Sequence, residues 1–74
     1  MNALGIIGNY VQRQADELLA IIYAGCPHWL EGADADLDVR PEIVNFLIHD
    51  ERVDDCRNSR ELVAAFRDRW EDER

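Results

Sequence analysis

The longest uncharged run in the chain extends over thirteen residues, from Leu18 to Leu30. Every residue in it up to Ala24 is apolar or aromatic, so a helix formed here would be apolar around nearly its whole circumference. A helix of that kind must be covered on several sides, and we therefore expect the rest of the chain to pack on it. Gly25 and Pro27 interrupt the run, which is too short to span a bilayer.

Apolar residues before and within this run recur at steps of three or four, which predicts one helix over residues 2–24. The stripe consists of Leu4, Ile7, Val11, Ala15, Leu18 and Ile22. Asn2 is expected to cap the start of this helix, and Gly25 is expected to end it, with Pro27 just beyond. At about 1.5 Å per residue the helix would be about 35 Å long, which is long for a chain of 74 residues.

Two further helical segments are predicted directly downstream. Residues 27–31 are expected to form a single helical turn that tucks Trp29 and Leu30 under the long helix. Residues 32–39 are expected to form a loop. Pro41 then suits the first position of a second helix, because its fixed φ is helical and its missing N–H is not needed there.

A third helix is predicted to begin at Asn58, because Glu61 follows three residues later, which is the spacing of a capping box. Its buried stripe is expected to consist of Leu62, Val63, Phe66 and Trp70. The pattern as a whole predicts an all-α fold, a small three-helix bundle with a long N-terminal helix and a short extra helical turn. We expect residues 1–74 to form a single acidic helical domain.

The charge of the chain is strongly acidic. Sixteen acidic residues stand against eight basic ones, for a formal net charge of −8, and all the basic residues are arginines. Residues 1–30 hold one arginine and two acids, whereas residues 31–74 hold seven arginines and fourteen acids. Such acidity disfavours direct binding to nucleic-acid phosphates or to anionic membranes. A basic protein surface is the natural electrostatic partner.

The first residues do not resemble a secretory signal. No positive side chain occurs from Met1 to Tyr10, and Arg13, Asp16 and Glu17 interrupt the apolar residues that follow. Two cysteines are too few for a disulfide scaffold and are expected to be reduced. We therefore expect a cytoplasmic protein, in a bacterium or a phage-infected host cell.

Few residues of the chain suit nucleophilic catalysis. Ser59 is the only serine or threonine, and it lies where a helix cap is expected. Cys26 and His28 are two residues apart at a helix end, and no third group that would orient them is evident. The chain has no lysine and no glycine-rich phosphate loop. The sequence therefore predicts a protein that is not an enzyme and uses no cofactor.

Two thiols and two imidazoles could in principle bind zinc, since Cys26, His28, His49 and Cys56 make a legitimate tetrahedral set. Their spacing matches none of the common zinc-finger patterns. The alternative is that the cysteines are buried and that the histidines lie at helix ends, where His49 would suit the helix dipole. Whether the four residues converge is left open by the sequence.

The acidic loop after residue 32 begins like a calcium-binding loop, with Asp34, Asp36 and Asp38 at alternate positions. The pattern then fails, because the sixth position is Val39 instead of glycine and the twelfth is Asn45 instead of glutamate. A solvated acidic loop that presents charges to a partner is the better interpretation.

These observations favour a non-catalytic binding protein whose partner is a larger protein with a basic surface. Carboxylates on a rigid helical frame can occupy a groove built for nucleic-acid phosphates. The most concrete version is a phage-type or plasmid-type inhibitor that mimics nucleic acid and blocks a bacterial defence complex, such as a restriction or CRISPR effector. The residues expected to contact the partner are Asp34, Asp36, Asp38, Asp50, Glu51, Asp54 and Asp55.

Two other interpretations remain open. Acidity can simply keep a small protein soluble. Alternatively, the chain is an accessory or regulatory subunit, antitoxin-like or anti-activator-like, that binds through apolar helix faces. Ile6, Tyr10 and Ile21 would form a secondary face on the long helix suited to a homodimer, the commonest symmetric assembly.

Overall fold

The computed structural model describes the backbone of residues 3–73 and the side chains of residues 9–73. Three α-helices are joined by short helical turns, and no strand occurs in residues 3–73. The elements are α1 (Ala3–Ala24), η1 (His28–Leu30), η2 (Ala35–Val39), α2 (Arg40–His49), η3 (Glu51–Asp55) and α3 (Ser59–Asp72). The predicted all-α bundle, with a long first helix and an extra turn after it, is confirmed.

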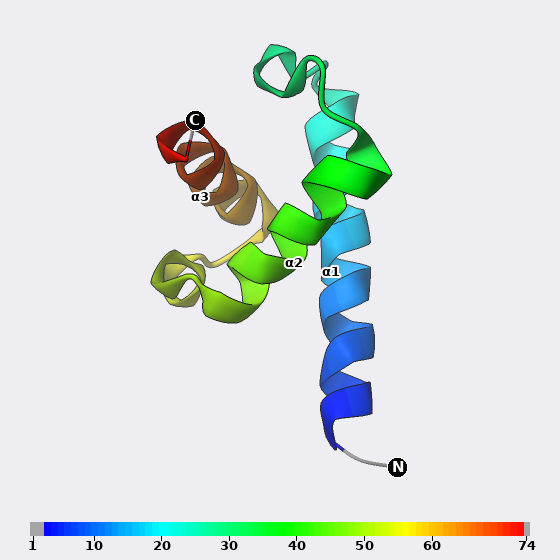
Figure 1. The fold of residues 1–74 in the computed structure, drawn as a ribbon. Coiled ribbons are helices and arrows are strands. Elements are labelled where there is room, and N and C mark those ends of the chain that lie inside the picture. The colour runs from blue at the N-terminus through cyan, green and yellow to red at the C-terminus, as the bar shows by residue number, and fades with distance from the viewer. Residues whose placement is uncertain (1–2, 74) are drawn as a thin grey trace.

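Helix α1 is the longest element of the fold, with 22 residues and a length of about 33 Å. Figure 1 shows α2 and α3 against its second half, while its first half extends past them toward the N-terminus. The predicted cap Asn2 and the side chains of Leu4 and Ile7 lie outside the described part of the structure. The rest of the predicted stripe, from Val11 to Ile22, is buried.

The most apolar stretch of α1 is covered on one side only. Leu18, Leu19 and Ile22 are buried, whereas Ala20 and Tyr23 are exposed. The described part of the chain therefore does not cover this stretch on several sides, and cover by a second copy of the chain stays a prediction. The helix still behaves as an amphipathic one. Alanine is small and tyrosine carries a hydroxyl group, so both tolerate contact with water, while the branched aliphatic residues on the other side are buried.

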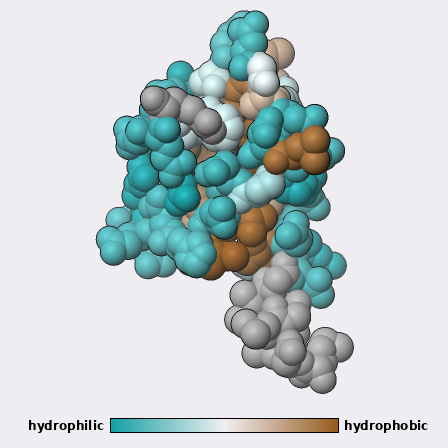
Figure 2. All heavy atoms as spheres, in the orientation of Figure 1, coloured by the Kyte–Doolittle hydropathy of each residue, from teal (hydrophilic) through white to brown (hydrophobic). Residues whose placement is uncertain are grey.

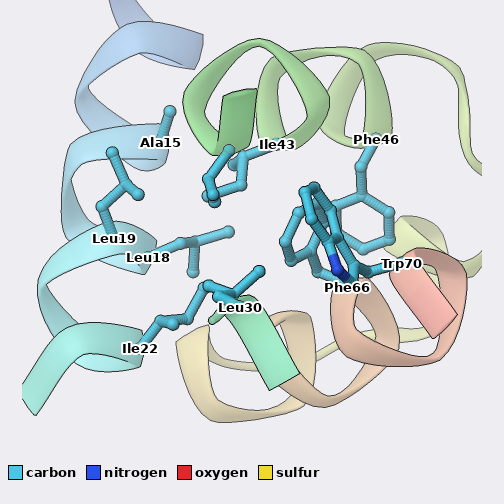
Figure 3. Packing of buried hydrophobic residues seen from close by; sticks show 10 residues of the cluster. Ala15, Leu18, Leu19, Ile22, Leu30, Ile43, Phe46, Phe66 and Trp70 are labelled. Atoms are coloured by element: carbon cyan, nitrogen blue, oxygen red, sulfur yellow. The ribbon is translucent and has the colours of Figure 1, made fainter. Parts of the chain in front are cut away.

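The core is built from all three helices and from η1. Figure 3 shows side chains from the three helices pointing toward one another, with Leu30 of η1 among them. Phe66 of α3 is fully buried, and its ring centroid lies 5.7 Å from that of Phe46, 6.1 Å from that of Trp29 and 6.0 Å from that of Trp70. This aromatic cluster joins α2, η1 and α3.

Helix α1 ends at Ala24, directly before Gly25, as predicted. Cys26, and not Gly25, takes the left-handed backbone conformation, with φ of 53°. Only glycine adopts this region without a steric cost from its side chain. Gly32, in the turn that follows η1, also has a positive φ, of 87°, and as a glycine it adopts this conformation without that steric cost.

These two positions give a paired prediction. Cys26→Gly is expected to raise the free energy of unfolding by about 0.5 kcal/mol, because the strain at Cβ is removed. Gly32→Ala is expected to lower it by about 1 kcal/mol, because alanine is strained at positive φ. Thermal denaturation followed by circular dichroism measures both changes. A rise in stability on Gly32→Ala would contradict this account of the turn.

Two turns that the sequence did not reveal flank α2. The expected loop at 32–39 contains η2, a π-helical turn that leads directly into α2 and buries Val39 completely. The region after His49 contains η3, a five-residue 3₁₀ turn. Pro41, predicted at the first position of the second helix, is the second residue of α2 and so lies in its first turn. Asn58 caps α3, and its side-chain oxygen accepts a hydrogen bond of 3.0 Å from the Glu61 N–H.

Candidate functional site

The seven acids expected to bind a partner form two groups at opposite ends of α2. Asp34, Asp36 and Asp38 lie at η2, which precedes α2, and the other four lie in the segment 50–55, which follows it. Because α2 has ten residues, about 15 Å of helix separates the groups. Figure 1 shows the two turns at the two ends of α2. The seven carboxylates therefore do not form one continuous surface.

The carboxylates of the first group are engaged within the chain. The Asp34 side chain accepts hydrogen bonds from the N–H groups of Asp36 and Leu37, at 2.9 and 2.8 Å. In return, Oδ2 of Asp38 accepts a bond of 2.8 Å from the Asp34 N–H. These reciprocal bonds satisfy backbone donors that the start of a helical turn leaves free. Asp34 and Asp38 thus organise η2, although both residues are exposed.

Asp36 takes part in an ion pair that connects η2 to α1. Arg40 donates to Oδ1 of Asp36 at 3.2 Å and also bonds with Asp16 of α1. The hydrogen bond with Asp16 is the main reason why the pKa of Arg40 is raised, and the bond with Asp36 adds to it. The pairs fix the start of α2 against the long helix.

Asp50 is a structural residue, and the expectation that its carboxylate is exposed was wrong. Its side chain is only 10% exposed. It accepts hydrogen bonds from the backbone N–H and from Nε and Nη2 of Arg52, at 2.9, 3.0 and 3.0 Å. A further bond of 3.4 Å comes from Nη1 of Arg69 on α3. Asp50 therefore caps η3 and ties it to α3.

The pKa of the Asp50 carboxyl lies below its ordinary value of 3.8, chiefly because the Arg52 side chain donates to the ionised form. A carboxyl whose pKa is lower in the folded state stabilises the fold fully above its unfolded pKa, and this contribution is lost as the pH falls through the lowered value. The difference in free energy of unfolding between the wild type and Asp50→Asn is therefore expected to be constant above about pH 4 and to shrink below it. Urea denaturation at several pH values measures this difference. A constant difference down to about pH 2.5 would contradict the assignment.

The remaining three predicted acids are free for a partner. Glu51, Asp54 and Asp55 are exposed on η3 and make no hydrogen bond or ion pair with the described residues. Three further acids make no hydrogen bond or ion pair with the described residues and were not expected from the sequence to bind a partner: Glu31 and Asp68, which are exposed, and Glu42, which is half-buried. Whether a carboxylate stays unpaired depends on tertiary contacts, and no local pattern marks it.

Glu31 and Glu42 line a groove of about 650 Å³. Its walls also include Trp29, Trp70, Leu37 and Asp38, and none of its lining residues is basic. Figure 1 shows η1, the start of α2 and the C-terminal end of α3 at the same end of the molecule. The groove thus combines aromatic walls with three carboxylates.

A second groove, of about 360 Å³, lies between α1, η3 and the start of α3. No acid lines it, and its lining includes Tyr10, Leu47 and Leu62. Tyr10 is 69% exposed and Ile48 of α2 is 55% exposed. Figure 2 shows a mostly hydrophilic face, with hydrophobic atoms exposed near the start of α2 and at the lower end of the body, where α2 ends against α1.

The cysteines and histidines do not converge on a metal site. Within residues 3–73, no three His, Cys, Asp or Glu residues lie where they could hold one ion. Cys26 is exposed, whereas Cys56 is half-buried and its Sγ–H donates to the carbonyl oxygen of Arg52 at 3.2 Å. Burial raises the pKa of the Cys56 thiol, and the charges of Glu61 and Asp55 raise it further. A thiol in this environment stays protonated and is a weak nucleophile.

No helix in the described part of the chain combines the length and hydropathy needed to cross a membrane. Comparison of the chain with protein-family models, with curated proteins and with solved structures finds no match.

Proposed function

We propose that this protein is a non-catalytic binding protein that docks, through carboxylates at the ends of α2, onto a basic surface of a larger protein. The observation that carries this proposal is the set of five acids near the ends of α2 that make no hydrogen bond or ion pair with the described residues, four of them exposed and Glu42 half-buried. Four arginines, Arg40, Arg52, Arg67 and Arg69, already form ion pairs within the chain. Glu51, Asp54 and Asp55 at one end of α2, and Glu31 and Glu42 at the other, have no such partner.

The rigidity of the frame supports docking as well as solubility. The turn η3 is held by the buried Asp50 network, and η2 is held by its own reciprocal caps and by the Arg40 pairs. Carboxylates on fixed turns lose little conformational freedom on binding, and preorganisation of this kind favours affinity. Acids whose only role was solubility would not require turns that are held in place by hydrogen bonds and ion pairs.

The partner surface that fits best is one that normally binds nucleic acid. Such surfaces carry arginine and lysine arranged for phosphates, and a negatively charged protein of matching shape competes for them. The most concrete version of this proposal is a phage-encoded or plasmid-encoded inhibitor of a bacterial restriction or CRISPR effector. Small size, strong acidity and the lack of catalytic residues support this version.

The test compares two variants with the same change in charge. The first is Glu51→Gln with Asp54→Asn on η3, and the control is Glu17→Gln with Glu71→Gln on α1 and α3. Immobilised wild-type protein is expected to retain nucleic-acid-binding proteins from a bacterial lysate at low salt. The η3 variant is expected to lose about tenfold in affinity for the retained protein, at about 0.7 kcal/mol for each carboxylate, whereas the control changes little. Equal affinity of all three proteins would overturn the proposal.

A second candidate function is supported by the acid-free groove beside Tyr10. A helical accessory subunit that binds through apolar faces, including a homodimer, would use this groove and the exposed Ile48. Tyr10→Arg is then expected to abolish self-association in analytical ultracentrifugation, whereas Tyr23→Arg at the other end of α1 is expected to leave it unchanged. Such docking would depend weakly on salt, in contrast to binding through carboxylates.

A further inference from the structure

We propose that the groove between η1, η2 and the end of α3 binds an arginine side chain from an exposed basic segment of the protein partner. This inference rests on the proposed function and names the chemistry of one contact. The groove is walled by Trp29, Trp70 and Leu37, and its carboxylates belong to Glu31, Asp38 and Glu42.

The walls differ in how much surface they expose, because Trp70 is buried in the core whereas Leu37 and part of Trp29 are accessible. Leu37 is 77% exposed, although it follows a well-ordered cap, and Trp29 is half-buried. The reciprocal bonds between Asp34 and Asp38 hold Leu37 and Asp38 on η2. Leu37 therefore adds accessible apolar surface at the edge of the groove.

The charges of the groove complement a cation. Glu31 and Glu42 make no hydrogen bond or ion pair in the described structure, and Asp38 uses only Oδ2, in its bond with the Asp34 N–H. No basic residue is among those that line the groove, whereas three of them carry carboxylates. The nearest example of the expected contact is internal, because the guanidinium carbon of Arg67 lies 5.6 Å from the centroid of the Trp29 ring.

Arginine fits these features better than lysine does. Its flat guanidinium stacks on tryptophan, it is weakly hydrated, and its forked donors match carboxylates. The three methylene groups of its side chain can contact Leu37 while the charged end reaches the acids. Lysine would gain the charge attraction but not the stacking or the forked hydrogen bonds.

Binding in the groove can be followed by tryptophan fluorescence, because both tryptophans of the chain line it. Intrinsic tryptophan fluorescence is therefore expected to change saturably on titration with triarginine peptide at low salt. Trilysine is expected to bind at least about threefold more weakly, since it lacks the stacking contribution. No saturable change with triarginine, or equal affinity for the two peptides, would overturn the inference.

Two variants with the same change in charge distinguish binding of the peptide in this groove from its attraction to the net negative charge of the chain. Glu31→Gln with Glu42→Gln is expected to weaken triarginine binding by about tenfold. Glu51→Gln with Asp54→Asn, which makes the same change in charge on η3, is expected to leave it within about twofold. Equal weakening in both variants would show a response to net charge alone and would overturn the inference.

The same variants distinguish failure of this inference from failure of the proposed function. If the full-length partner binds the groove variant as well as the wild type but loses affinity for the η3 variant, the groove inference fails while the proposed function stands. If neither variant weakens that complex, and raised salt does not weaken it either, both proposals fail.

Discussion

Replacing Phe66 with alanine is expected to lower the free energy of unfolding by about 3–5 kcal/mol. The ring is fully buried and contacts the rings of Trp29, Phe46 and Trp70, so its removal leaves a cavity at the meeting point of η1, α2 and α3. Small domains have a total stability of about 5–15 kcal/mol, and 74 residues bury a modest core. We therefore expect the variant to be largely unfolded at 37 °C, as measured by urea denaturation with far-ultraviolet circular dichroism.

A matched variant separates the cavity from the loss of aromatic contacts. Phe66→Leu keeps most of the buried volume and is expected to cost about 1–1.5 kcal/mol. Near-ultraviolet circular dichroism would also report the loss of ordered tryptophans when Phe66 is truncated. If Phe66→Ala costs less than about 1 kcal/mol, the helices do not pack around this ring as described.

Replacing Asp50 with alanine is expected to lower the free energy of unfolding by about 2–3 kcal/mol, the second-largest effect. The substitution removes one of the two carboxylates that pair with Arg69, whose side chain is only 18% exposed, and leaves the 3.4 Å pair between Arg69 Nε and Glu73. It also removes the cap of η3. In a domain of this size the loss corresponds to a fall in Tm of about 10–20 °C.

The adjacent acid provides the control for Asp50. Glu51→Ala removes an exposed, unpaired carboxylate and is expected to change the free energy of unfolding by less than about 0.5 kcal/mol. The double variant Asp50→Ala with Arg69→Met is expected to recover part of the stability, because the arginine that lost its Asp50 partner is replaced by an apolar side chain. Equal effects of Asp50→Ala and Glu51→Ala would contradict the structural role of Asp50.

The fold was largely predictable because its helices depend on local patterns. The three-to-four spacing of Val11, Ala15, Leu18 and Ile22 and the Asn58–Glu61 spacing each locate a helix without knowledge of its partners. Short turns such as η2 and η3 have no periodicity of their own. They depend on hydrogen bonds that Asp34 and Asp50 accept, and the sequence does not show which aspartates of an acidic stretch have that role.

The candidate site was predictable only in part, because the availability of a carboxylate is a tertiary property. Asp50 and Glu51 are neighbours in the sequence, yet one is buried among arginines and the other is free. The pairing of Asp50 with Arg69 joins residues nineteen positions apart, which no local pattern reveals. The groove that contains Glu31 and Glu42 likewise forms only when η1, η2 and α3 meet.

Competition with nucleic acid tests the central claim most directly. Once a partner has been captured, its complex with this protein is titrated with a DNA or RNA ligand of that partner, and the species are separated by size-exclusion chromatography with light scattering. If the carboxylates of this protein occupy the basic surface, the two ligands exclude each other, and added salt weakens both complexes. A stable ternary complex of partner, nucleic acid and this protein would contradict the claim.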